Sequence, residues 1–240
     1  MHRVELLARW LAVGGDRASG HMLLDRYDEA HRGYHNARHL SEVLHAIDAL
    51  SRGVDGRPTD GDRPTDGNQL ARPAVGRPAS SFSPAAVVLG AFWHDAVYDP
   101  RRGDNEEQSA LLAEPVLRRL DLPERTVRQV VALVRLTATH DPSPGDLDGA
   151  VLCDADLAIL AAGPRRYRDY VVGVRREYAH LDDPAFAAGR ADVLRALLAR
   201  PALYRTATGH RHWEDAARAN VRAELITLAP TRAQGDLADG

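Results

Sequence analysis

The sequence predicts an all-α fold, a single globular helical bundle around one core. Apolar residues recur every three or four positions in most segments, which is the spacing of one buried face of a helix. No segment shows the sustained alternation of polar and apolar residues that is typical of a half-buried strand. With 44% hydrophobic residues in 240, the chain can bury a sizeable core.

The first three helices are expected over residues 2–13, 20–31 and 36–50. Asn36 is a good N-cap for the third of these helices. The buried face of that helix is formed by residues at helical spacing, namely Leu40, Val43, Leu44, Ile47 and Leu50.

Residues 51–82 differ in character from the helices around them. They are rich in Gly, Pro, Asp and Arg, and they contain a short near-repeat, GRPTDG followed by DRPTDG. Such a composition favours a flexible surface insertion, with a lid over a site as the alternative. We therefore expect one domain over 1–240, interrupted by this insertion and ending in a tail that frays after about 229.

A central helix is expected over residues 83–99, SPAAVVLGAFWHDAVYD. Ser83 suits the N-cap and Pro84 the first helical position, and Pro100 should end the helix after Asp99. Because nearly every residue from 85 to 97 is apolar, other helices should surround this one. The apolar run contains the adjacent pair His94 and Asp95, which is costly to bury unless each finds a partner.

Six more helices complete the predicted bundle. Acidic residues begin the helix at 104–120, and Pro115 should kink or split it. Gly163 and Pro164 should end one helix and begin the next. The remaining segments are 123–138, 148–163, 164–180, 184–199 and 211–229.

Charge and cysteine content narrow the possible partners and compartment. The net charge is −3, so no basic surplus draws the chain to a nucleic-acid polymer or an anionic membrane. A single cysteine, Cys153, fits a reducing cytoplasmic setting, and its expected state is an inert buried thiol. No apolar stretch approaches the roughly 20 residues that span a bilayer.

Histidine and aspartate recur on three of the predicted helices. The order is His39, then His94 and Asp95, then Asp156, and it resembles the HD-domain superfamily of metal-dependent phosphohydrolases. The strings YHNARH, AFWHDAVYD, DNEEQSA, DADLAIL and RREY resemble one subfamily of predicted HD phosphohydrolases. The resemblance covers roughly residues 20–228 and leaves the insertion outside it.

The resemblance implies an HD-type helical bundle in which His39, His94, Asp95 and Asp156 hold one divalent ion. Two imidazoles and two carboxylates without a thiolate suit Mn²⁺, Fe²⁺, Co²⁺, Ni²⁺ or Mg²⁺ and leave positions open for water and substrate. Asp154 competes with Asp156 for the last ligand, since residues two apart on a helix face different directions. The family pattern favours Asp156.

Other residues have two interpretations each. Asp99 lies four positions after Asp95 and either assists proton transfer with it or only ends the helix. Either Asn105 and Glu106 orient water or substrate, or they simply begin a helix. His35 and Asn36 are candidates for substrate contact as well as for local backbone hydrogen bonds.

Two further candidates lie later in the chain. Arg175 either clamps a substrate phosphate or is solvated on its helix. His140 lies between the His94-Asp95 pair and Asp156, the interval in which two-metal HD enzymes have extra histidines. A single histidine there is too few for a second metal, so a site for one metal ion is favoured.

The predicted function is hydrolysis of a phosphate ester or anhydride on a nucleotide-like small molecule by a metal-bound water. A non-catalytic HD scaffold that binds a nucleotide or metal is the main alternative. A di-iron oxygenase and a purely structural helical protein are the others. The substrate and the oligomeric state stay open at this stage.

Overall fold

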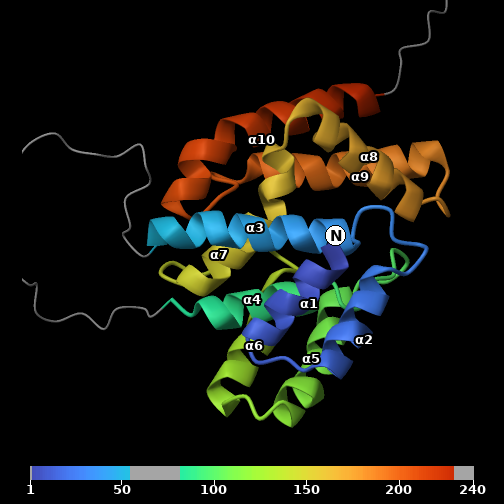
Figure 1. The fold of residues 1–240 in the computed structure, drawn as a ribbon. Helices are drawn as coiled ribbons and strands as arrows, with labels where there is room; N and C mark the ends of the chain where they lie inside the picture. Colours follow the sequence, from blue (N-terminus) through green and yellow to red (C-terminus); the bar gives the residue numbers. More distant parts are fainter. Residues whose placement is uncertain (1, 55–81, 230–240) are drawn as a thin grey trace, which may run out of the picture.

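The computed structural model describes residues 2–54 and 82–229, and these form ten α-helices, one 3-10 helix (η1) and no strand. The predicted all-α class is confirmed (Figure 1). Most of the expected insertion and tail, residues 55–81 and 230–240, lies outside the described residues. The elements are α1 (His2–Ala12), α2 (Arg17–Tyr27), α3 (Ala37–Val54), α4 (Pro84–Trp93), α5 (Asn105–Arg119), α6 (Glu124–Leu136), α7 (Leu147–Asp156), η1 (Leu157–Ala161), α8 (Pro164–Glu177), α9 (Asp183–Ala199) and α10 (Ala207–Leu228).

Helix α3 lies between two groups of helices. Figure 1 shows α8, α9 and α10 on one side of it and the remaining helices on the other. The buried apolar side chains accordingly form two clusters, one from α1–α7 and one mainly from η1 and α8–α10. The expectation of one core is therefore wrong in detail, although Trp213 packs against both clusters.

Helix α4 is buried from its third residue onward, as its apolar composition predicts. Every residue from Ala86 to Trp93 is buried, and the helix contacts α3, α5, α6 and α7. Because apolar side chains point in all directions from it, surrounding helices are needed to remove them from water. This position makes α4 the centre of the larger cluster.

The expected end of α4 at Asp99 is wrong, since the helix ends at Trp93. The carbonyl groups at and just after its end accept hydrogen bonds from side chains of other segments, and not from the N–H groups of a further helical turn. The hydroxyl of Tyr27 lies 3.2 Å from the carbonyl oxygen of Phe92, and Arg32 donates to the carbonyl oxygen of Asp95 at 2.8 Å. His94 and Asp95 therefore lie in a turn.

Other helices also differ from those expected: α2 and α10 begin three or four residues earlier than predicted. Helix α5 continues through Pro115 and is not split there. The helix predicted over 148–163 ends at Asp156, where the chain tightens into the 3-10 helix η1. A change from α to 3-10 geometry alters the direction of the side chains around it, and here it lies directly at a candidate ligand.

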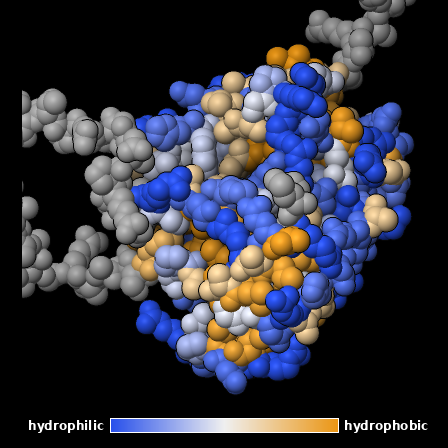
Figure 2. All heavy atoms as spheres, in the orientation of Figure 1, coloured by the Kyte–Doolittle hydropathy of each residue, from blue (hydrophilic) through white to orange (hydrophobic). Residues whose placement is uncertain are grey.

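The surface mixes polar and apolar residues. Figure 2 shows hydrophobic residues gathered mainly over the lower half of the face seen in Figure 1, among hydrophilic ones. The large apolar side chains that are most exposed lie on five different helices, and they are Val4, Leu111, Val172, Val193 and Ile226. Within the described residues, none of the helices combines the length and apolar character needed to cross a membrane.

Candidate metal centre and adjoining cavity

Four potential metal ligands converge where α3, α4 and α7 meet. These three helices contact one another pairwise. Helix α3 carries His39, the turn after α4 carries His94 and Asp95, and Asp156 is the last residue of α7. Both imidazoles are almost fully buried, with exposed fractions of 1% for His39 and 2% for His94.

The ligand atoms are separated by distances that suit a shared ion. Nε2 of His39 lies 3.2 Å from Nε2 of His94 and 3.1 Å from Oδ1 of Asp156. Oδ2 of Asp95 lies 3.1 Å from Nε2 of His94 and 3.5 Å from that of His39. Atoms about 2.1 Å from one ion and at octahedral or tetrahedral angles are about 3.0–3.4 Å apart. The ligand atoms of His39, His94 and Asp156 all lie within 4.8 Å of one another.

The hydrogen bonds that this group makes, and one that it lacks, also fit a bound cation. Nδ1 of His94 donates to the carbonyl oxygen of Ala91 at 2.8 Å, so Nε2 is the atom that faces the group. Oδ2 of Asp95 is buried and receives no hydrogen bond. A buried carboxylate oxygen without a partner is costly, and a divalent ion bound among these four side chains would satisfy it.

Charge within the group shifts the pKa of each member. Burial alone would raise the pKa of Asp95 and Asp156, but the nearby imidazoles hold both well below their usual value. Burial would lower the pKa of His39 and His94, but the carboxylates raise both. Each set of side chains thus stabilises the charged form of the other.

The structure distinguishes Asp154 from Asp156. Asp154 is fully buried, and Oδ2 accepts hydrogen bonds from the backbone N–H and the hydroxyl of Thr206 at 2.8 and 2.7 Å. Oδ1 accepts from the N–H of Arg205 at 2.8 Å. Asp154 therefore holds the start of α10, and Asp156 alone of the two reaches the imidazoles.

His140 adds a fifth side chain at the edge of the group. Its Nε2 lies 2.7 Å from Oδ2 of Asp156, the oxygen turned away from His39. The backbone of His140 has a φ of 49°, a conformation that few residues other than glycine adopt. Arg200 supports this conformation, because its guanidinium donates to the carbonyl oxygens of Thr139 and His140.

The structure does not bring Asp99 to the group. Because α4 ends at Trp93, the argument that placed Asp99 one helical turn after Asp95 does not apply. The Asp99 carboxylate accepts from the N–H of Arg101 at 2.9 Å, within its own turn. Asn105 bridges the backbone of Asp99, accepting from its N–H and donating to its carbonyl oxygen, so its amide is also occupied locally.

Arg175 and Asn36 have local roles as well. Arg175 pairs with Asp183 and donates to two carbonyl oxygens in the turn between α8 and α9. The side-chain oxygen of Asn36 accepts from the N–H groups of Arg38 and His39, as expected of an N-cap. It thereby fixes the first turn of the helix that carries a ligand.

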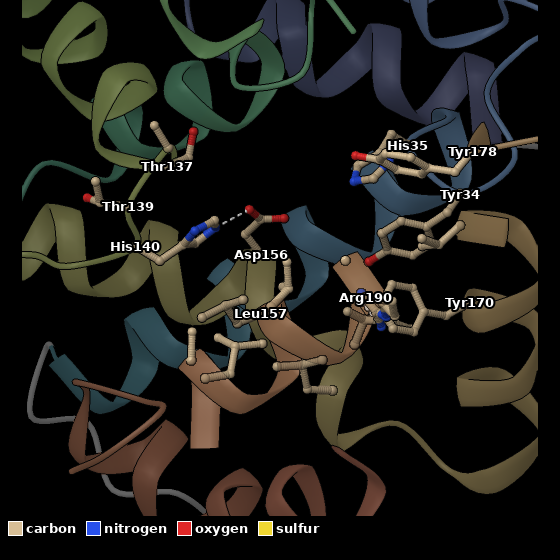
Figure 3. A pocket seen from close by; sticks show the side chains of 18 of the residues that line it. Tyr34, His35, Thr137, Thr139, His140, Asp156, Leu157, Tyr170, Tyr178 and Arg190 are labelled. Atoms are coloured by element: carbon tan, nitrogen blue, oxygen red, sulfur yellow. Dashed lines mark hydrogen bonds and ion pairs between the residues drawn. The ribbon is translucent and has the colours of Figure 1, made fainter. Parts of the chain in front are cut away.

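His35 and Glu106 line a cavity of about 650 Å³ that adjoins Asp156 (Figure 3). A second, smaller cavity of about 240 Å³ shares Asp156 and Tyr34 with it. Figure 3 shows His140 and Asp156 at one side of the larger cavity and Tyr34, His35 and Tyr178 at the other. The candidate metal centre thus opens to spaces that can admit a small molecule.

Sequence reasoning missed Glu177, the last residue of α8. Its buried carboxylate accepts from the N–H groups of Tyr34 and His35, at 2.7 and 2.9 Å. It also accepts from Nδ1 of His35 and from the hydroxyl of Tyr98, both at 2.8 Å. The string RREY contains Glu177, but nothing in its spacing shows that it meets residues so distant in the chain.

Arg32 was also missed. Its side chain is fully buried and donates to the carbonyl oxygens of His35 and Asp95 at 2.9 and 2.8 Å. It thereby ties the loop before α3 to the turn after α4, and both segments carry members of the site.

Together, the fold and the site define an all-α protein with a buried His-His-Asp group that can hold a metal ion. No protein-family model matches the chain, and no curated protein or solved structure matches it significantly.

Proposed function

We propose that this chain is a metal-dependent hydrolase of a phosphate ester or anhydride on a small molecule, of the HD-domain type. The observation that carries the proposal is the convergence of two imidazole nitrogens and two carboxylate oxygens, 3.1–3.5 Å apart in the contacts given above. His39, His94, Asp95 and Asp156 would hold one divalent ion, with Mn²⁺, Fe²⁺, Co²⁺, Ni²⁺ and Mg²⁺ as the candidates.

The chemistry of the donor set favours hydrolysis over a structural role. Closed structural zinc sites in proteins use mostly thiolates, whereas nitrogen and carboxylate ligands leave room for water and substrate. When bound, a divalent ion supplies Lewis acidity toward phosphoryl oxygens and lowers the pKa of water.

The side chains around the group position it and limit access to it. The hydrogen bond to Ala91 orients the imidazole of His94, and the hydrogen bond to His140 orients the carboxylate of Asp156. Burial of His39 and His94 excludes bulk water from one side. The 650 Å³ cavity leaves the side of Asp156 open to a substrate.

The test combines metal content with activity in the same samples. Purified protein is loaded with Mn²⁺, Co²⁺ or Ni²⁺, dialysed, analysed for bound metal and assayed with generic phosphate monoesters. We expect about one ion per chain and hydrolysis that depends on it. His94→Ala should lose both, whereas His45→Ala, which removes a side chain 59% exposed on α3, should lose neither.

Two outcomes would contradict the proposal. Metal content and hydrolysis unchanged in His94→Ala would show that the group does not hold the ion. One bound ion without hydrolysis of any ester would favour the non-catalytic scaffold.

A further inference from the structure

The cavity beside Asp156 is mainly apolar away from the metal centre. Figure 3 shows a group of aliphatic side chains, including Leu157, below Asp156 and beside Arg190. Helix α9 forms part of the wall with Ala185, Gly189 and Val193, which lie one helical turn apart. A Cβ atom built on Gly189 would meet nothing within 4 Å, so this part of the wall faces open space.

The two arginines among the described residues that line the cavity already have partners. Arg190 donates to both carboxylate oxygens of Glu224, at 2.7 and 3.1 Å, and to the hydroxyl of Tyr170. Arg200 donates to the carbonyl oxygens of Thr139 and His140. The carboxylate of Glu224 balances the charge of Arg190, and the N–H groups that Arg200 uses here are already bound to backbone carbonyl oxygens.

Other polar side chains of the lining are similarly occupied. The hydroxyls of Thr137 and Thr139 donate to backbone carbonyl oxygens one helical turn earlier. His35 is hydrogen-bonded to Glu177. The acidic residue Glu106 adds a group that disfavours further phosphates. A ribose or a polyphosphate would find few free partners here.

Among the described residues that line this cavity, one buried side-chain polar atom lacks a hydrogen-bond partner, the hydroxyl of Tyr34. This side chain is 95% buried, given its exposed fraction of 5%, and its oxygen has no hydrogen-bond partner. Figure 3 shows the hydroxyl pointing into the space between Asp156 and Tyr170. A buried hydroxyl without a partner costs free energy, and a phosphoryl oxygen next to the metal centre would remove that cost.

We propose that the substrate is a phosphate monoester whose single phosphoryl group lies between Asp156 and Tyr34 and whose apolar body fills the cavity against α9. This inference rests on the proposed hydrolase function and specifies its substrate class. It departs from the nucleotide-like substrate suggested by the sequence, because the cavity offers apolar surface in place of free polar groups.

The experiment measures kcat/KM of the metal-loaded protein for alkyl phosphates from ethyl to octyl, whose leaving alcohols differ little in acidity. Burial of each methylene is worth at most about fourfold in binding. We therefore expect kcat/KM to rise about two- to fourfold per methylene until the cavity is full, and to be lower for AMP and ADP than for octyl phosphate. A flat series, or AMP or ADP as the better substrate, would overturn the inference.

Two variants, with one control, test where the apolar body and the phosphoryl group of the substrate bind. Gly189→Phe should remove the advantage of octyl over ethyl phosphate and leave ethyl phosphate unchanged. Ala188→Phe, at the exposed neighbouring position outside the lining, should leave the whole series unchanged. Tyr34→Phe should lower kcat/KM about tenfold for every ester alike, since it removes a hydrogen bond to the group they share.

Binding of alkylphosphonates, which are not hydrolysed, separates this inference from the proposed function. Calorimetry on the metal-loaded protein should show octylphosphonate binding more tightly than methylphosphonate, with the difference lost in Gly189→Phe. If octylphosphonate binds more tightly but no ester is hydrolysed, the proposed hydrolase function is wrong, while the apolar cavity remains supported as a binding site. Equal binding of the two phosphonates would overturn the cavity assignment even if esters are hydrolysed.

Discussion

Asp154 and Asp156 differ by two positions in the chain and should differ completely in what their substitution changes. Asp154 is fully buried and accepts from the N–H groups of Arg205 and Thr206 and from the hydroxyl of Thr206. In Asp154→Asn one oxygen becomes an NH₂ group, which cannot accept, so one or two of these donors lose their partner. At about 1–3 kcal/mol for each buried group, we expect the free energy of unfolding to fall by about 2–4 kcal/mol.

Asp156→Asn should instead remove the effect of metal on stability. An ion at a hundred times its dissociation constant stabilises the native state by about 2.7 kcal/mol. For a domain of this size that corresponds to a rise in Tm of about 5–11 °C. The rise should occur in the wild type and in Asp154→Asn. In Asp156→Asn, a hundredfold weaker affinity would leave only about 0.4 kcal/mol.

The assay is thermal unfolding followed by the helical circular dichroism signal, with and without Mn²⁺, Co²⁺ or Ni²⁺ at pH 7. The metal-free Tm of Asp154→Asn should lie about 5–15 °C below that of the wild type. The assignment would be refuted by a full metal-dependent rise in Asp156→Asn. Loss of that rise in Asp154→Asn, with an unchanged metal-free Tm, would equally contradict it.

Three further substitutions or measurements test the surroundings of the site. Hydrogen bonds to His35 and the backbone outweigh burial and lower the pKa of Glu177, so its contribution to stability is present above the unfolded-state pKa of about 4.3 and is lost as the pH falls. Glu177→Gln should therefore have a lower free energy of unfolding at pH 7 than the wild type. When urea unfolding is measured at decreasing pH, its free energy of unfolding should fall less steeply. Gly33→Ala would place its Cβ 2.3 Å from the carbonyl oxygen of Gly173 and should destabilise the protein by about 1–3 kcal/mol or more, whereas Gly163→Ala, which meets nothing, should not. Burial raises the pKa of the Cys153 thiol, so it should react with a thiol reagent only after unfolding; rapid reaction of the native protein would contradict its buried position.

The sequence by itself determined the helices and the segments that carry the candidate ligands. Helical periodicity, an asparagine N-cap before α3 and a proline at the start of α4 are local signals, and they act within one or two turns of the chain. The buried His94 in an apolar segment also indicated a polar site in the core, because such a group needs a partner. The structure brings His39, His94 and Asp156 together where those segments meet.

Tertiary structure decided where α4 ends and which candidates reach the site. Tyr27 and Arg32 take carbonyl groups that another turn of α4 would have used, and the Asp99 carboxylate is bound within its own turn instead. Arg175 is likewise engaged in a turn between helices.

The cavity, and the groups that line it, also depend on tertiary contacts. Glu177 meets residues more than 140 positions earlier in the chain. The ring of Tyr34 packs against Tyr170 of α8, and its buried hydroxyl is left without a partner. Hydrogen bonds between residues so far apart leave no periodic pattern, since nothing constrains their spacing along the chain. Only the packed helices determine which polar groups find protein partners and which stay available to a ligand.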